Sequence, residues 1–172
     1  MITLIYGGSS SGKSAYAEDY VCQYNCANRY YLATMQANDS ESLERIKRHR
    51  SLRSGKDFIT LEQPYDIGNT IQANEDSIIL LECMSNLVAN EMFRDGKVNS
   101  ETVVVKKIIN DVKLLASKVT QLVIVSNDVF EDGLEYDEYT KEYLRALGKI
   151  NAEIAKIADR SVEVVVGIGV ER

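Results

Sequence analysis

Apolar residues gather in six short runs along the chain, at residues 2–6, 29–34, 58–61, 77–83, 121–126 and 162–168. Several of these runs are apolar throughout instead of alternating between apolar and polar residues. Continuous apolar runs are typical of strands in a parallel sheet, because helices cover both faces of such a sheet. We therefore predict six strands at these positions.

Between the expected strands, apolar residues recur at the spacing of a helix face. Two sets step along the chain by three, four and three residues: Val105, Ile108, Val112 and Leu115, then Leu147, Ile150, Ile154 and Ile157. That spacing places each set on one side of a helix. Because strands and helices alternate, the sequence predicts an α/β fold with a mainly parallel sheet flanked by helices. Polar residues at 38–40 and 94–97 indicate loops.

The size and charge of the chain narrow the possible classes of function. A chain of 172 residues has room for one ordinary core, so we expect a single domain over residues 1–172. A net charge of −6 argues against a nucleic-acid partner. No apolar run approaches the ~20 residues of a membrane span, and the N-terminus lacks a signal-peptide pattern. Three cysteines, an odd number, suit free thiols, so we expect a cytoplasmic enzyme.

The strongest chemical signal is a phosphate-binding loop between the first expected strand and a helix that begins near Ser14. In the pattern GxxxxGK[ST], backbone N–H groups converge on phosphate oxygens, and the helix N-terminus adds partial positive charge. Lys13 would reach the β- and γ-phosphates, and Ser14 would hold Mg²⁺. We therefore expect a nucleotide-binding, P-loop NTPase-like fold. The matching residues are Gly7, Gly8, Ser9, Ser10, Ser11, Gly12, Lys13 and Ser14.

Phosphate chemistry also requires a carboxylate that organises the metal. The apolar run at residues 78–81 is followed by Glu82, which is the arrangement of a Walker B strand. The usual residue at that position is Asp. The extra methylene of Glu82 could place the carboxylate on the metal, on a water or on a nucleotide hydroxyl. The alternative is an acid that merely ends a strand.

The only histidine, His49, lies in a basic segment of this acidic chain. Residues 41–53 have the spacing of a helix, and His49 belongs to a polar stripe along it. Leu43 and Ile46 mark a different side of this helix, which we expect to face the core. We therefore expect His49 to be accessible. The stripe consists of Glu41, Arg45, His49 and Arg53.

The surroundings of His49 suggest covalent chemistry. Neutral imidazole is a good nucleophile near pH 7, and neighbouring arginines would bind the phosphates that it attacks. This combination suits nucleotidyl transfer. Composition alone leaves a solvated basic helix with an incidental histidine as the alternative. An RNA-binding patch is disfavoured, because the segment lacks interleaved aromatic residues.

Six sequence blocks resemble one family over nearly the whole chain. They are GGSSSGKSAYAE, YYLATMQANDSESLERIKRHRSLR, FITLEQP, IILLECMSNLVANEMF, IVSNDVF and GKINAEIAKIADRSVEVVVGIGV. The phosphate loop alone is common to many families, whereas the RIKRHR block with its histidine is far more specific. The chain resembles the bifunctional adenosylcobinamide kinases and adenosylcobinamide-phosphate guanylyltransferases of cobalamin assembly.

That resemblance implies a set of site residues and ligands. His49 would become guanylylated, and the loop from Gly7 to Ser14 with Lys13 would hold the nucleotide phosphates, next to the Mg²⁺ site that the loop and strand patterns predict at Ser14 and Glu82. ATP and GTP would be substrates, with adenosylcobinamide and its phosphate as acceptors. A homo-oligomer such as a trimer is also implied. Beyond the phosphate loop, the residues expected around the nucleotide are Thr34, Met35, Arg50, Arg53, Glu62 and Glu82.

The resemblance implies two reactions on one fold. The γ-phosphoryl group of a nucleoside triphosphate moves to the aminopropanol hydroxyl of adenosylcobinamide. His49 then takes GMP from GTP, and adenosylcobinamide phosphate displaces His49 to give adenosylcobinamide-GDP. Two other hypotheses are a P-loop small-molecule kinase with a different acceptor, in which His49 only binds phosphate, and a slow nucleotide-dependent regulatory protein.

The chain also departs from the family pattern. Asp128 and Phe130 stand where many relatives have Glu and Gly, and residues 143–145 replace a common Arg-Asp pair. These differences affect the expected contacts with the corrinoid more than the nucleotide chemistry.

Overall fold

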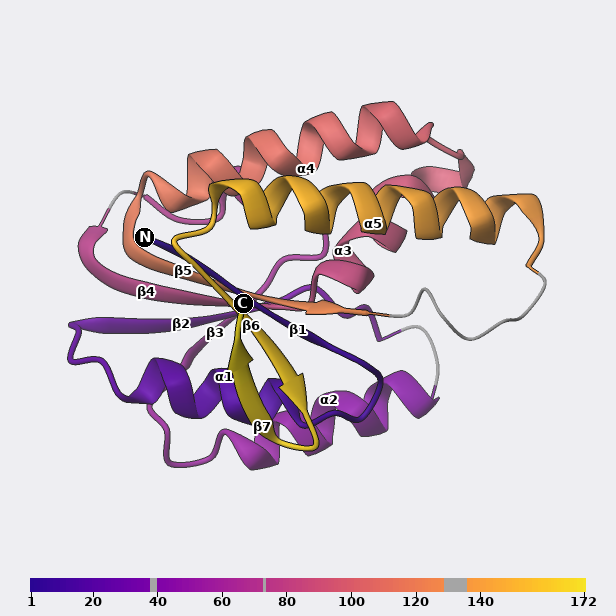
Figure 1. Ribbon diagram of the computed structural model, residues 1–172. Helices are drawn as coiled ribbons and strands as arrows, with labels where there is room; N and C mark the ends of the chain where they lie inside the picture. Colours follow the sequence, from indigo (N-terminus) through magenta and orange to yellow (C-terminus); the bar gives the residue numbers. More distant parts are fainter. Residues whose placement is uncertain (38–39, 73, 129–135) are drawn as a thin grey trace.

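Seven strands form one sheet in the computed structural model, which describes residues 1–37, 40–72, 74–128 and 136–172 (Figure 1). The strands lie in the order β3-β2-β4-β5-β1-β6-β7, and the neighbouring pairs are parallel except for β6 with β7. The strands are β1 Ile2–Gly7, β2 Asn28–Ala33, β3 Ile59–Glu62, β4 Asn74–Glu82, β5 Val119–Asn127, β6 Arg160–Val165 and β7 Ile168–Glu171.

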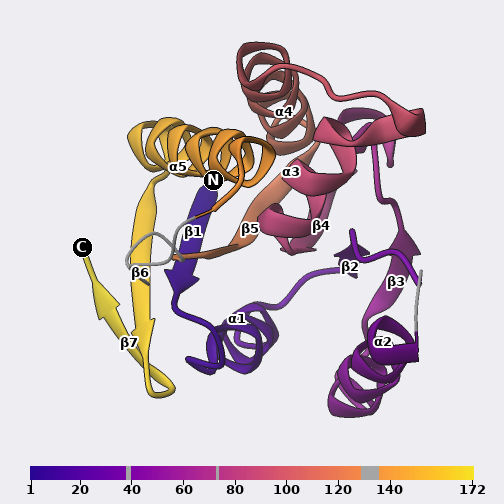
Figure 2. The ribbon, with the colours of Figure 1, turned by 90° about the vertical axis from the view of Figure 1, so that its right-hand side faces the viewer.

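Helices cover both faces of this sheet. The helices α1 and α2 lie on one face, and α3, α4 and α5 lie on the other (Figures 1 and 2). The helices are α1 Lys13–Cys22, α2 Ser40–Leu52, α3 Met84–Met92, α4 Glu101–Ala116 and α5 Glu138–Ile157, with short 3₁₀ helices η1 Ile67–Asn69 and η2 Arg94–Gly96. The predicted fold class is therefore confirmed.

The two-sided cover explains the continuous apolar runs. In β4, Ile78 and Leu80 are buried in the cluster that packs against α1. Their neighbours Ile79 and Leu81 point the other way and are buried in the cluster beneath α3, α4 and α5. Because successive side chains of a strand point to opposite faces, both faces of β4 must be apolar.

Parallel pairing brings the functional segments to one edge of the sheet. Strand β5 lies between β1 and β4. Gly7 at the end of β1 is in register with Asn127, and Glu82 at the end of β4 is in register with Ala33 of β2. The carboxyl ends of parallel strands form the usual ligand-binding edge of an open α/β sheet. The phosphate loop and Glu82 therefore lie near one another.

The prediction of one strand at residues 162–168 is wrong. The chain reverses at Val166 and Gly167, and β7 returns antiparallel to β6. Both turn residues have positive φ angles, of 50° and 78°. Positive φ at both central residues is typical of a tight hairpin turn. The sequence obscures this turn because Val166 is an unusual residue there and is apolar although it is 86% exposed.

The other expected elements differ from the structure at their ends. The strand expected at 77–83 ends one residue early, at Glu82. The expected loop at 94–97 contains the 3₁₀ helix η2. In the other expected loop, residues 38–39 lie outside the described residues, and Ser40 already begins α2.

The central sheet should carry much of the stability. Leu80 is fully buried in β4, so Leu80→Ala removes apolar contacts and leaves a cavity, which should lower the free energy of unfolding by about 2–5 kcal/mol. Leu114 on α4 is 41% exposed, and Leu114→Ala serves as the control with a much smaller loss. Denaturant unfolding followed by circular dichroism measures both. Equal losses for the two variants would contradict this burial pattern.

Candidate active site

The phosphate loop folds around the Lys13 amine. Helix α1 begins at Lys13, and its N-cap is Gly12, with a φ of 88° that favours glycine. Lys13 Nζ donates to the carbonyl oxygen of Gly8 at 3.0 Å. Burial lowers the pKa of Lys13, while the nearby Glu82 carboxylate acts in the opposite direction. An ammonium group has three N–H donors, so Lys13 can hold the loop and still donate to a phosphate oxygen.

The β6–β7 hairpin braces this loop from one side. The backbone N–H of Gly167 donates to the carbonyl oxygen of Ser11 at 2.7 Å. A Cβ atom on Gly12 would lie 3.1 Å from the Cα of Gly167. A Cβ atom on Gly7 would lie only 2.5 Å from the carbonyl oxygen of Val164. Close backbone packing therefore requires glycine at position 7, and at position 12 it adds to the requirement set by the backbone conformation.

Glu82 links the phosphate loop to β4. Its Oε1 accepts a hydrogen bond from Ser14 Oγ at 2.8 Å. Its Oε2 is shielded from solvent and has no hydrogen-bond partner within the described part of the chain. Burial raises the pKa of Glu82 to about 7, although the hydrogen bond from Ser14 and the charge of Lys13 lower it. The hydroxyl group of Ser14 and the carboxyl group of Glu82 thus lie side by side at this position.

Thr34 supports Glu82 from behind. Its side chain is fully buried, and its Oγ1 donates to the carbonyl oxygen of Cys83 at 2.8 Å. The same Oγ1 accepts from the backbone N–H of Cys83 at 2.9 Å. The Thr34 backbone N–H also donates to the carbonyl oxygen of Glu82 at 3.0 Å. Thr34 therefore fixes the end of β2 to the end of β4 and does not line the cavity described next.

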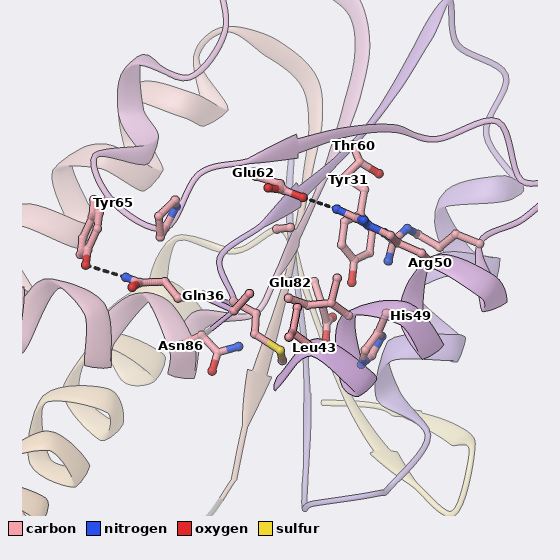
Figure 3. A pocket seen from close by; sticks show the side chains of 16 residues that line it. Tyr31, Gln36, Leu43, His49, Arg50, Thr60, Glu62, Tyr65, Glu82 and Asn86 are labelled. Atoms are coloured by element: carbon pink, nitrogen blue, oxygen red, sulfur yellow. Dashed lines mark hydrogen bonds and ion pairs between the residues drawn. The ribbon is translucent and has the colours of Figure 1, made fainter. Parts of the chain in front are cut away.

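A cavity of about 460 Å³ lies between α2 and the ends of β2 and β3 (Figure 3). Its size suits a small organic ligand, since such sites usually measure about 300–1,000 Å³. The structure brings six of the predicted site residues together around it: Met35, His49, Arg50, Arg53, Glu62 and Glu82. The phosphate loop does not line this cavity. It contacts a residue that does, because Ser14 at the end of the loop donates a hydrogen bond to Glu82.

The prediction that Leu43 and Ile46 face the core on a separate side from His49 is wrong. Both residues line the same cavity as His49, and Leu43 is 47% exposed. Helix α2 lies beside β3 at the edge of the sheet (Figure 2). Its apolar residues therefore form a wall of the cavity instead of packing into the core. His49 is half-buried on this wall, and its Nδ1 is shielded from solvent.

The two arginines of the cavity differ in their partners. The guanidinium of Arg53 lies over the ring of Tyr31, 3.4 Å from its centroid, and only 7% of the residue is exposed. Arg53 Nη1 is buried without a hydrogen-bond partner among the described residues. Arg50 instead forms an ion pair with Glu62 (Figure 3). A buried cation with an unused donor is a good anion-binding group, so Arg53 suits a phosphate better than Arg50 does.

Several residues of the cavity wall were not predicted from the sequence. Tyr65 and Gln36 lie on the wall away from α2 and hydrogen-bond to each other, with Gln36 Nε2 donating to Tyr65 Oη at 2.5 Å (Figure 3). Asn90 on α3 holds this wall, because its Nδ2 donates to the carbonyl oxygens of Thr34 and Pro64 at 2.7 and 3.0 Å. Tyr65 lies just after the carboxyl end of β3, and this position at the ligand-binding edge of a parallel sheet is the signal that could have identified it as a cavity residue.

Other classes of site receive no support within the described residues. They contain no group of three or more His, Cys, Asp and Glu side chains arranged to hold a metal ion by themselves. No helix among them is long and apolar enough to cross a membrane. Cys22, Cys26 and Cys83 form no disulfide, as the sequence predicted.

Similar solved structures share the fold. One ATPase domain superimposes with a TM-score of 0.52 at 13% identity, covering 94% of this chain and 68% of that chain. An ATPase from the type III secretion system of pathogenic bacteria gives 0.53 at 11% identity, covering 99% and 56%. At these identities the likeness supports the P-loop fold alone.

Proteins with similar sequences identify the family more closely than the shared fold does. The chain is 28% identical to the bifunctional adenosylcobalamin biosynthesis protein CobU of Escherichia coli K12 and 29% identical to that of Salmonella typhimurium, with 99% of each chain covered in both cases. CobP of Pseudomonas aeruginosa, which carries the same description, is 26% identical, covering 98% of this chain and 95% of the relative. The family model described as cobinamide kinase / cobinamide phosphate guanyltransferase matches residues 3–171. This match over almost the whole chain shows that the protein belongs to the cobinamide kinase / cobinamide phosphate guanyltransferase family.

Proposed function

We propose that this chain phosphorylates adenosylcobinamide and then transfers GMP to the product through a guanylylated His49. The observation that carries the proposal is the double contact of Glu82. Its carboxyl group touches Ser14 of the phosphate loop and also borders the cavity that contains His49. A triphosphate on the loop can therefore extend its α-phosphate and nucleoside into that cavity.

In the guanylyl transfer, His49 is the nucleophile. An imidazole nitrogen bonds to the α-phosphorus of GTP while the bond from that phosphorus to the oxygen bridging to the β-phosphate breaks, and pyrophosphate leaves. A phosphate oxygen of adenosylcobinamide phosphate then attacks the same phosphorus. The phosphorus–nitrogen bond breaks, which frees His49 and gives adenosylcobinamide-GDP. Two displacements replace one difficult transfer.

In the kinase reaction, the aminopropanol hydroxyl of adenosylcobinamide attacks the γ-phosphorus of ATP or GTP. The bond to the oxygen bridging to the β-phosphate breaks, and the nucleoside diphosphate leaves. Lys13 and the backbone N–H groups of residues 7–14 stabilise the developing negative charge. Most of the rate acceleration in such transfers comes from positioning and electrostatic stabilisation.

The remaining predicted residues have distinct roles in this proposal. Arg53 stabilises charge on the phosphates near His49, which its buried, unused donor supports. Arg50 and Glu62 hold each other at the cavity wall, where they contact the nucleoside. Met35 packs against the nucleoside as an apolar wall residue. Thr34 supports Glu82 and does not contact the nucleotide.

Ser14 and Glu82 fit a Mg²⁺ ion. Their side chains meet at 2.8 Å, and Glu82 Oε2 has no other partner among the described residues. Magnesium in phosphate-transfer sites commonly uses one or two protein carboxylates together with phosphate oxygens and waters, so a larger acidic cluster is not needed. When bound there, the ion neutralises charge on the β- and γ-phosphates.

His49→Ala should separate the two activities. Guanylylation should be abolished, because the nucleophile is lost, whereas phosphorylation of adenosylcobinamide needs no imidazole and should fall much less. Incubation with α-labelled GTP followed by acid treatment measures the acid-labile phosphoramidate, and a separate assay measures adenosylcobinamide phosphate. Lys47→Ala, at an exposed residue of the same helix, is the control and should retain both. Labelling of the His49→Ala variant would instead show that another residue is the nucleophile, and a wild-type protein that takes up no label would support the small-molecule kinase hypothesis.

Lys13→Ala should impair both reactions. Each reaction develops negative charge on the same phosphates, and removing one such electrostatic contact typically lowers a rate by ~10²-fold or more. Steady-state assays of each half-reaction give the two rates, with Lys106→Ala on the exposed face of α4 as the control. If either reaction kept its normal rate in the Lys13→Ala variant, that reaction would use another site.

The free energy of unfolding of the ligand-free protein should decrease as pH rises, because of the Glu82 carboxyl group. Its pKa is about 7 in the folded chain against an ordinary value of 4.5, so the folded state binds the proton more tightly. The resulting stabilisation is complete below about pH 4.5 and is lost as pH rises through about 7. Glu82→Gln should flatten this decline between about pH 5 and 8, measured as the melting temperature without nucleotide or Mg²⁺. A variant with the same pH slope as the wild type would contradict the raised pKa.

A further inference from the structure

A second cavity, also of about 460 Å³, lies on the opposite face of the sheet from His49. It lies between α5 and the strands β1 and β6, where α5 covers these strands (Figure 2). Ala152 and Ala155 of α5 line it, and because both alanines and Asp128 are exposed, this cavity is open to solvent along the side of α5. Nothing in the nucleotide chemistry described above uses this cavity.

The second cavity begins beside the phosphate loop. Tyr6, which directly precedes Gly7, forms part of its wall, and so does Asp128. The backbone N–H of Asp128 donates to the carbonyl oxygen of Gly7 at 2.9 Å. Asp128 follows the end of β5, the strand between the phosphate loop and the strand of Glu82. A ligand in this cavity can therefore reach the phosphate end of a bound nucleotide from the side away from His49.

The polar groups of the cavity fit an uncharged ligand that carries hydroxyl and amide groups. Asn151 Oδ1 accepts from Ser126 Oγ at 2.6 Å and Asn151 Nδ2 donates to the carbonyl oxygen of Asn127 at 3.2 Å, which fixes the amide and leaves one N–H for a ligand. Ser161 adds a hydroxyl group. Arg172 is already paired with Glu163 through Nε and Nη2. Among the described residues, Asp128 therefore supplies the one carboxylate of the wall.

We propose that this cavity binds the hydroxyl-bearing arm of the phosphoryl acceptor and that the Asp128 carboxylate accepts the proton of its hydroxyl group. The inference rests on the proposed kinase function and assigns the acceptor site within it. The hydroxyl oxygen bonds to the γ-phosphorus, its O–H bond breaks, and the proton moves to Asp128. The bond from the γ-phosphorus to the β-bridging oxygen breaks, and the nucleoside diphosphate leaves. A carboxylate that receives the hydroxyl proton is the usual arrangement in phosphoryl transfer to alcohols.

The same carboxylate distinguishes substrate from product. The alcohol arm is neutral, whereas its phosphate ester carries close to two negative charges near neutral pH. Like charges at short distance repel, so Asp128 weakens binding of the phosphorylated arm. The product then leaves this cavity and can approach the guanylylated His49 on the other face. Two cavities that share one phosphate loop thus give the two transfers separate acceptor positions.

Two variants test the assignment in the full chain. Asp128→Asn should lower kcat for phosphorylation of adenosylcobinamide by about 10²-fold or more, as expected for loss of a general base. It should also bind adenosylcobinamide phosphate more tightly than the wild type does, measured by calorimetry. Ala155→Leu fills the cavity and should raise KM for adenosylcobinamide by about tenfold with a smaller change in kcat. Asp95→Asn, in the exposed 3₁₀ helix η2, is the matched control and should change none of these values.

Guanylylation of His49 by GTP, measured on the same preparations, reports whether each variant is folded and binds nucleotide. It should remain at the wild-type level in the Asp128 and Ala155 variants. Wild-type kcat and KM for adenosylcobinamide in both variants would overturn the acceptor site while leaving the proposed function intact. A wild-type protein that neither phosphorylates adenosylcobinamide nor takes up GMP would instead contradict the proposed function itself.

Discussion

The hydrogen bond between Ser14 and Glu82 is the contact on which the arrangement of the site depends. It joins the first turn of α1 to the end of β4. Strand β5 lies between β4 and β1, the strand that precedes α1, so the bond spans the end of β5. Glu82 in turn is held by Thr34, which ties β2 to the same edge. The phosphate loop, the carboxyl group and the His49 cavity therefore keep fixed positions relative to one another. Preorganised groups of this kind stabilise developing charge without further rearrangement.

The sheet separates the site into two sides. Successive side chains of a strand point to opposite faces of the sheet. The residues near the ends of β1, β2, β4 and β5 therefore line different cavities on the two faces. One face carries His49 and Arg53 beside α2, and the other carries the open cavity along α5 that begins at Asp128. The phosphate loop lies at the edge where these faces meet. A single loop can thus serve a reaction at the α-phosphorus and another at the γ-phosphorus without one acceptor blocking the other.

Local signals in the sequence predicted the fold and the centre of the site. The phosphate loop, the acid after an apolar strand and the histidine in a basic helix each carry their chemistry in a short segment. The cavity along α5 has no such signal, because its lining residues, such as Tyr6, Asp128 and Ala155, are far apart in the sequence. The hairpin at Val166 was hidden by its apolar sequence, and the direction of Leu43 and Ile46 depended on where α2 lies relative to the sheet. The expected homo-oligomer and the cytoplasmic location stay predictions.

Locating the covalent intermediate tests the proposed role of His49 most directly. The wild-type protein is incubated with GTP and Mg²⁺, digested under alkaline conditions that preserve phosphoramidates, and analysed by tandem mass spectrometry. Covalent catalysis by His49 predicts one added GMP per chain, on His49. Recovery of the GMP on Lys13 or Lys47 would contradict it, because His49 would then be a phosphate-binding residue and the reaction would proceed through a different nucleophile.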